Sequence, residues 1–307
     1  MRNITCQVLA DLHKDSPFVF LTGDLGFMAL EPLRDALGPY FINAGVAEQN
    51  MVSVAAGIAS SNIQCWVYSI APFIYARPFE QIRNDVCLHK FDVKLVGNGG
   101  GYAYGSMGST HHAIEDYGVL LTLQNMRAYI PAFAEDVPAI IARMAQSHGP
   151  AYLRLGRCEK PSGFSLPRYA AWRKVMDGNG PVLVVIGPIA GSLISKLCGV
   201  PPSVRPQLWV LSELPVDVAG MPDEFLNALR QRGQLAVVEE HVIQGSAGQM
   251  LTHRLLSSGI TVRSFQHFHA KGYPSGLYGS QTFHRKECGL DPESILNEIG
   301  LAEKAFL

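Results

Sequence analysis

The sequence lacks the signatures of several protein classes. Its 6 cysteines are scattered, with no Cys-x-x-Cys pair and no histidine at zinc-ligand spacing, so we expect free thiols rather than a zinc site or disulfides. No apolar run approaches the roughly 18 residues of a membrane span, and the longest, residues 182–194, is broken by Gly187, Pro188 and Gly191. The first residues also lack the apolar core of a signal peptide. These absences predict a cytoplasmic protein.

An excess of charge of one sign and the common nucleotide-binding motifs are missing too. The 25 basic and 26 acidic residues leave a net charge of −1, so we expect neither nucleic acid nor a membrane as a partner. The glycine-rich stretch 98–112 contains neither Gly-x-Gly-x-x-Gly nor a Walker pattern, which disfavours a nucleotide loop. Its glycines would let the backbone approach a different kind of ligand closely.

The chain of 307 residues does contain short apolar runs that alternate with helical patterns. Runs such as 18–21 and 93–96 suit buried parallel strands, and residues 135–147 suit a helix with one apolar face. A second alternation starts at residue 182, after a stretch rich in proline, glycine and basic residues. The pattern predicts an α/β protein of two tandem domains, each a mostly parallel sheet with helices on both faces. The expected limits are 1–160 for the first domain, 161–180 for a linker and 181–307 for the second domain.

Glu48 is the first candidate functional residue. It follows a predicted strand end at residues 40–43 and a turn at Gly45, and it opens a helix whose body is almost uncharged. A carboxylate there suits the positive helix end, a structural role worth about 0.3–1 kcal/mol when exposed. The alanine, valine, methionine and glycine around it indicate instead a desolvated acid with a function. The residues by themselves leave both roles open.

The phrase Asn-Ala-Gly-Val-Ala-Glu-Gln-Asn-Met at residues 43–51 resembles the transketolase segment whose glutamate faces the pyrimidine ring of thiamine diphosphate. Further phrases at residues 68–73, 77–85 and 108–116 match the same family in order and spacing. Together they are similar to the carboxy-terminal subunit of a split transketolase, a pyrimidine-binding domain followed by the family's C-terminal domain. Residues 237–248 resemble that second domain, to which we assign no chemistry. The resemblance implies ketol transfer, in which thiamine diphosphate carries a two-carbon unit from a ketose or its phosphate to an aldose.

The resemblance also implies roles for single residues. Glu48 would share a proton with the aminopyrimidine ring and so activate the cofactor. Tyr68, Phe73 and Tyr75 lie in the matching loop and would hold that ring by stacking, with Phe73 and Tyr75 favoured, although each taken alone also suits a core position. His111 would stand beside the thiazolium and the donor's oxygen, where it can donate a hydrogen bond or shuttle a proton.

Several residues of the glycine-rich stretch bear on the choice of substrate. His112 stands where many family members have glutamine and is a further candidate for the substrate pocket. Met107 replaces the aspartate that contacts a sugar hydroxyl in many transketolases, and Ser109 replaces the usual proline. We therefore expect donor recognition to differ from that of the ordinary pentose phosphate enzyme.

Arg157 matches an arginine that many family members use to hold the substrate's phosphate, and a guanidinium fork suits that task. Arg2 is a weaker match to another phosphate-contacting arginine. For Arg2 and Arg154 we expect a structural role. No residue of this chain is assigned to a metal.

One motif of the family is absent. Its members bind the diphosphate through Mg²⁺ with a Gly-Asp-Gly phrase, and the nearest stretch here, residues 22–25, lies in the wrong domain. The resemblance therefore implies an amino-terminal transketolase subunit as a partner that carries the diphosphate-binding domain and most of the Mg²⁺ site, in an expected α2β2 assembly. Two alternatives stay open: a subunit of a deoxyxylulose-phosphate-synthase-like or 2-oxoacid-decarboxylating thiamine enzyme, and a catalytically silent regulatory partner.

Overall fold

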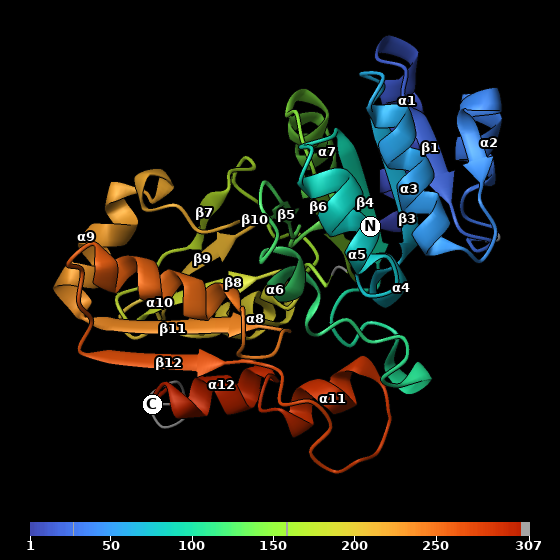
Figure 1. Ribbon diagram of the computed structural model, residues 1–307. Helices are drawn as coiled ribbons and strands as arrows, with labels where there is room; N and C mark the ends of the chain where they lie inside the picture. The colour runs from blue at the N-terminus through green and yellow to red at the C-terminus, as the bar shows by residue number, and fades with distance from the viewer. Residues whose placement is uncertain (27, 158, 302–307) are drawn as a thin grey trace.

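The strands form two sheets in the computed structural model, which describes residues 1–26, 28–157 and 159–301 (Figure 1). The first sheet contains β1 (Val19–Thr22), β2 (Phe41–Asn43), β3 (Cys65–Ile70), β4 (Val93–Asn98), β5 (Arg127–Tyr129), β6 (Ala151–Leu155) and β10 (Glu213–Leu214). The second contains β7 (Trp172–Met176), β8 (Val182–Ile186), β9 (Gln207–Leu211), β11 (Gln234–Glu239) and β12 (Ser264–Phe268). Their orders are β10-β5-β6-β4-β3-β1-β2 and β12-β11-β8-β9-β7.

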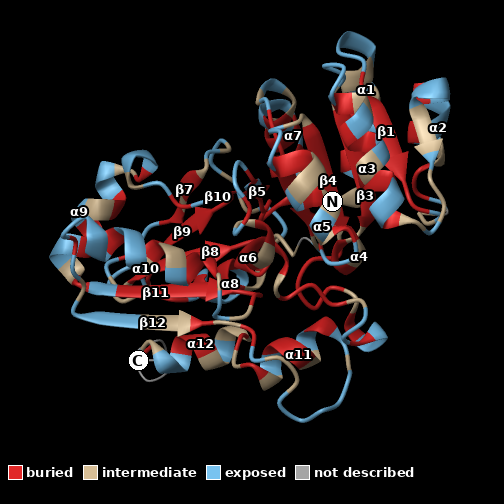
Figure 2. Cartoon of the chain, viewed as in Figure 1, coloured by how far each residue is buried: buried red, intermediate tan, exposed pale blue. Residues whose placement is uncertain are grey.

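The predicted α/β class with mostly parallel sheets is confirmed. Among the described strands, neighbours pair in parallel except for β5 with β10 and β7 with β9. Because a buried parallel strand carries apolar side chains on both sides, each sheet needs helices on both faces. Figure 2 shows the result: most strands are buried, the edge strand β12 is largely exposed, and exposed residues lie on the outer sides of the helices.

The helices of the first half cover both faces of the first sheet. On one face lies α3 (Glu48–Ala59), which packs against β3 and the neighbouring strands. On the other face α1 (Arg2–Asp15) and α7 (Val137–Gln146) pack side by side, and α2 (Glu31–Leu37) packs against α1. Successive residues of β3 therefore belong to different cores, a point that decides which of them can reach the candidate site.

Short helical segments connect the strands of the first sheet. One of them, directly after α5, is a π-helix, a form that is often found at functional sites. The segments are η1 (Gly38–Tyr40), α4 (Ala71–Tyr75), α5 (Phe79–Gln81), the π-helix η2 (Ile82–Cys87), η3 (Gly105–Met107), α6 (Asp116–Leu120) and η4 (Ala134–Asp136).

The second sheet is covered in the same way. One face packs against α8 (Ala190–Leu197) and α12 (Pro292–Glu298), and the other against α9 (Asp223–Arg232) and α10 (Ala247–Ser257). The start of α12 is capped: the Asp291 carboxylate accepts a hydrogen bond from the backbone N–H of Ser294 at 3.1 Å, and a proline follows the cap. The remaining described helices are η5 (Val218–Gly220) and α11 (Gln281–Glu287).

Two strands were not predicted. The expected linker over 161–180 contains β7, whose Trp172 packs on Phe225 of α9 with ring centroids 4.8 Å apart. The two-residue strand β10 leaves the second half of the chain and pairs antiparallel with β5 of the first sheet. The limits of the two domains stay a prediction.

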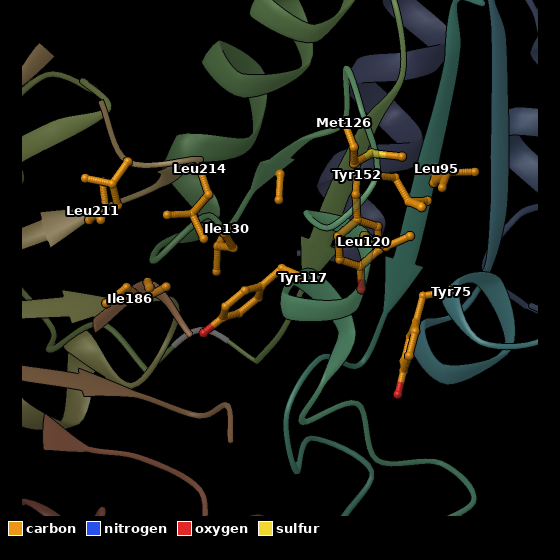
Figure 3. Close-up of a cluster of buried hydrophobic side chains, with 14 of the residues drawn as sticks. Tyr75, Leu95, Tyr117, Leu120, Met126, Ile130, Tyr152, Ile186, Leu211 and Leu214 are labelled. Atoms are coloured by element: carbon orange, nitrogen blue, oxygen red, sulfur yellow. The ribbon is translucent and has the colours of Figure 1, made fainter. Parts of the chain in front are cut away.

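A continuous apolar core joins the two halves. Figure 3 shows it running from Tyr75 and Tyr152 in the first half, past Tyr117 and Ile130, to Ile186 and Leu211 in the second half. None of the helices formed by the described residues has the length and apolar character needed to cross a membrane.

Candidate active site

The candidate site residues come from the carboxyl ends of neighbouring strands in the first sheet. Glu48 begins α3 shortly after β2, Phe73 lies on α4 directly after β3, and His111 follows β4 in the glycine-rich loop. Arg157 follows β6. Parallel strands point their carboxyl ends toward one edge of a sheet, which is where open α/β proteins bind ligands.

A tight turn at residues 43–45 connects β2 to α3. The side-chain oxygen of Asn43 accepts a hydrogen bond from the Gly45 N–H at 2.9 Å, and the Asn43 amide donates to Asp24 at 3.0 Å. Gly45 has a φ of 74°, a conformation that glycine adopts without steric cost. This tight turn sets Glu48 at the first position of α3.

The Glu48 carboxylate points into the protein. The residue is only 4% exposed, and Nη1 of Arg77 lies 2.8 Å from each carboxylate oxygen. The Ser69 hydroxyl donates a longer hydrogen bond, of 3.4 Å, to Oε1. Glu48 therefore lies at the positive end of a helix and also forms a buried ion pair with a partly exposed cation.

Arg77 also belongs to this group, although in the sequence it was recognised only as part of a matching phrase. Its side chain is 43% exposed, and its guanidinium carbon lies 3.8 Å from the centroid of the Phe73 ring. A guanidinium over an aromatic face is favourable and leaves the N–H groups free for a carboxylate. Because α4 ends at Tyr75, Arg77 lies beyond the helix, and no local pattern in the sequence indicates its contact with Phe73 or Glu48.

His111 also contacts Phe73. The His111 ring centroid lies 5.3 Å from that of Phe73 in an edge-on arrangement and 5.6 Å from that of Tyr104. Nδ1 of His111 is 2.9 Å from the Thr110 hydroxyl. The structure therefore brings Glu48, Phe73 and His111 together, through contacts that run from the carboxylate to Arg77, to the aromatic ring and to the imidazole.

Tyr75 lies close by in the chain but is turned inward. It belongs to the buried cluster of Figure 3, and its hydroxyl donates to Oε2 of Glu115 at 3.1 Å. Burial raises the pKa of the Tyr75 hydroxyl well above its usual range, and burial also raises the pKa of Glu115. The pair is therefore best described as a neutral phenol held by a partly desolvated acid.

Tyr68 is not brought to Glu48. It packs in the core beneath α1 and α7, with its ring 6.2 Å from that of Phe20, while the next residue, Ser69, faces Glu48. Strand residues alternate between the two faces of a sheet, so only one of this adjacent pair can face α3. The predicted cofactor contact of Tyr68 gains no support from this placement.

His112 and Met107 differ in their exposure to solvent. His112 is buried, with Nε2 2.8 Å from the carbonyl oxygen of Gly105 and Nδ1 3.0 Å from the hydroxyl of Tyr273 in the second half of the chain. Burial lowers the pKa of the His112 imidazole, which favours the neutral ring. Met107 is 55% exposed on η3. His112 thus serves a contact within the protein, whereas Met107 is open to solvent.

Arg157 borders a cavity of about 470 Å³. The start of α1 with Arg2 lines the same space, so two arginines and a helix N-terminus surround it. This combination favours an anion such as a phosphate. Tyr104 lines the cavity as well and contacts His111, which links the cavity to the group around Glu48. Arg154, as expected, is structural, since its Nε lies 2.9 Å from a buried Asp116 carboxylate.

Residues 1–161 match the family described as "Transketolase, pyrimidine binding domain". The chain belongs to the transketolase family. It is 30% identical to the B subunit of the apulose-4-phosphate transketolase of Actinobacillus succinogenes, over 83% of this chain and 82% of that one. It is 28% identical to the protein of the same name from Phocaeicola vulgatus, over 85% of each. A split-gene transketolase solved as an inactive β4 tetramer superposes with a TM-score of 0.80 at 25% identity, covering 97% of this chain and 96% of that chain.

These comparisons confirm the predicted resemblance of this transketolase-family chain to the carboxy-terminal part of a split transketolase. Within the part of the chain that the structure describes, no group of three or more His, Cys, Asp or Glu side chains is arranged to hold a metal ion.

Proposed function

We propose that this chain is one subunit of a thiamine-diphosphate-dependent enzyme that transfers a two-carbon ketol unit from a ketose phosphate to an aldose. The observation that carries the proposal is the buried carboxylate of Glu48 at a sheet edge, in contact through Arg77 and Phe73 with His111. Membership of the transketolase family supports the same reaction class.

The residues around Glu48 fit one end of the cofactor. An aminopyrimidine needs a carboxylate for its ring nitrogen and an aromatic surface, and Glu48 and Phe73 supply groups of these two kinds. Both short contacts of the carboxylate come from a single nitrogen of Arg77, so lone pairs on each oxygen are left for another donor. When bound, thiamine diphosphate supplies the carbon nucleophile that breaks and forms the C–C bond.

The roles of this chain's own side chains follow from their positions. Glu48 would hold the proton shared with the pyrimidine ring nitrogen, in surroundings from which water is largely excluded. Arg77, which stacks on the Phe73 ring and pairs with Glu48, would hold the phenyl ring and the carboxylate in fixed positions relative to each other. His111, whose ring meets that of Phe73 edge-on, would donate a hydrogen bond to the donor's oxygen.

The cavity bordered by Arg2 and Arg157 would bind the donor's phosphate. Arg2, for which we expected a structural role, would then also contact the phosphate. The names of the two relatives point to a sugar phosphate, and apulose 4-phosphate is accordingly the first donor to test. Exposed Met107, close in the chain to His111, would face the part of the donor in which substrates of the family differ.

A partner subunit would complete the site. The chain contains no Gly-Asp-Gly phrase, and its relatives are named as B subunits. We propose that an amino-terminal transketolase subunit contributes the diphosphate clamp and most of the Mg²⁺ ligands, in an α2β2 assembly in which the active site lies between the chains.

The test is to co-express the chain with an amino-terminal transketolase subunit that carries Gly-Asp-Gly, sought first in the adjoining open reading frame, and to assay the purified complex with thiamine diphosphate and Mg²⁺. We expect ketol transfer from apulose 4-phosphate or a related ketose phosphate, and loss of that activity in Glu48→Ala. Calorimetric titration should detect cofactor binding with the partner present and little without it. Decarboxylation of pyruvate instead, or a complex that binds no cofactor and is indifferent to Glu48→Ala, would contradict the proposal.

A further inference from the structure

A loop from the second half of the chain touches the stretch that carries His111. This brace loop, residues 272–280, connects β12 to α11 and lies beside η3 (Figure 1). The hydroxyl of Tyr278 is 2.9 Å from the hydroxyl of Ser109. The hydroxyl of Tyr273 is 3.0 Å from Nδ1 of His112, and these two rings are stacked with centroids 5.7 Å apart. Along the chain, the brace loop therefore contacts one residue before His111 and one residue after it.

The loop is itself firmly held. At its start the hydroxyl of Tyr102 donates to the Gly272 carbonyl at 2.7 Å, and near its end the Gly279 N–H donates to Nε2 of His284 at 3.2 Å. The rings of Tyr102 and His284 stack with centroids 5.0 Å apart, so both ends are tied to one aromatic pair. Between them Tyr278 is 52% exposed, and besides the hydroxyl of Ser109 its ring contacts Tyr273 at a centroid distance of 5.3 Å.

The two segments also fit closely along their backbones. A side chain at Gly108 would lie 3.0 Å from the Tyr278 ring, and one at Gly105 would lie 3.2 Å from the Gly279 carbonyl oxygen. Both glycines have positive φ, of 76° and 52°. Glycine at these positions thus serves the backbone turn and the approach of the brace loop at once.

We propose that the brace loop positions His111 for catalysis, with Tyr278 and Ser109 as positioning residues. The proposal rests on the proposed function, in which His111 contacts the donor. Contacts to residues 109 and 112 limit the movement of the backbone at His111 and so the position of its imidazole. The imidazole itself contacts a threonine hydroxyl and two aromatic rings. Small displacements of a contact that matters in the transition state are costly in rate. The second half of the chain would then contribute to catalysis without touching substrate.

Hydrogen exchange on the full-length chain by itself tests the brace. Tyr278→Phe and Ser109→Ala each remove one partner of a neutral hydrogen bond, and we expect exchange of the amides of residues 105–112 to become about 2- to 10-fold faster. The matched control is Tyr40→Phe, the same change at a tyrosine that is 46% exposed on η1, far along the chain from these segments. Equal melting temperatures for the variants would exclude general destabilisation. Unchanged exchange in both variants would overturn the brace.

Kinetics of the complex with the partner subunit test the consequence for catalysis. We expect Tyr278→Phe and Ser109→Ala to lower kcat about 2- to 10-fold with KM for the donor nearly unchanged, because the lost alignment matters most in the transition state. The double variant should be no slower than either single one, since both remove the same hydrogen bond. Faster exchange with wild-type kcat would overturn the catalytic role. A wild-type complex without ketol transfer would contradict the proposed function, and exchange would still decide for or against the brace.

Discussion

Replacing Glu48 with glutamine is the most direct test of the buried carboxylate, because the shape stays and only the charge and the proton are changed. On stability, the change removes a charge-assisted contact with Arg77, a kind of hydrogen bond worth about 1.5–3 kcal/mol. The Arg77 side chain is 43% exposed, so water replaces part of that contact and we expect a loss of about 1 kcal/mol. The amide can no longer share a proton with a ring nitrogen. General acid–base effects of this kind are worth about 10²- to 10⁴-fold, or about 3–5 kcal/mol of barrier.

Two measurements separate these effects. Urea unfolding of the isolated chain gives the stability change, and the rate of deuterium uptake at C2 of the cofactor in the assembled complex, followed by NMR, gives the activation step. Glu80→Gln, at an exposed glutamate on α5, is the control and should match wild type in both. Wild-type deuterium uptake in Glu48→Gln would refute the reasoning, since it would mean that no proton passes through this carboxylate.

Other substitutions test single contacts. Arg77→Met leaves the buried carboxylate beside it unpaired, and urea unfolding should show a loss of about 1–2 kcal/mol, with exposed Arg83→Met near wild type. Arg157→Ala should raise KM for a phosphorylated donor about 10- to 100-fold and leave that for an unphosphorylated analogue unchanged. Burial raises the pKa of Glu240, but the Arg285 guanidinium and hydrogen bonds from Gln281 and the Tyr102 N–H together more than offset this, so the folded pKa lies below the ordinary one. The ionised Glu240 carboxylate therefore contributes its full stabilisation to the folded chain above about pH 4.3, and this contribution is lost as the pH falls further. Glu240→Gln should weaken the acid-induced fall in melting temperature, and an unchanged pH profile would contradict this.

Most strands of the fold were predictable because a buried parallel strand is a short apolar run whatever its neighbours are. The exceptions were strands whose burial depends on a distant partner. In β7, Arg173 and Lys174 suggested a linker, yet Arg173 is buried because it pairs with Asp136 at 2.8 Å. The two residues of β10 are too few to form a pattern, and they are a strand only through pairing with β5.

The candidate site was predictable to the extent that its members lie in matching phrases. Glu48, Phe73 and His111 were named from the sequence, and the structure brings them into one group. Arg77 was not given a role, because nothing local indicates a contact with a glutamate far back in the chain. Tyr68 was grouped with them because proximity in sequence does not tell which face of a strand a residue occupies.

The sequence alone determined the class of fold, most of the strands along the chain and the positions of the acid and the histidine. These depend on apolar periodicity and on short phrases, which are local properties of the chain. The tertiary structure decided which face of β3 meets α3, which cation lies against the carboxylate, and that the brace loop reaches the His111 stretch. Those contacts join residues far apart in the chain: the packing of α3 on the first sheet produces the first two, and the packing of the two halves of the chain produces the third.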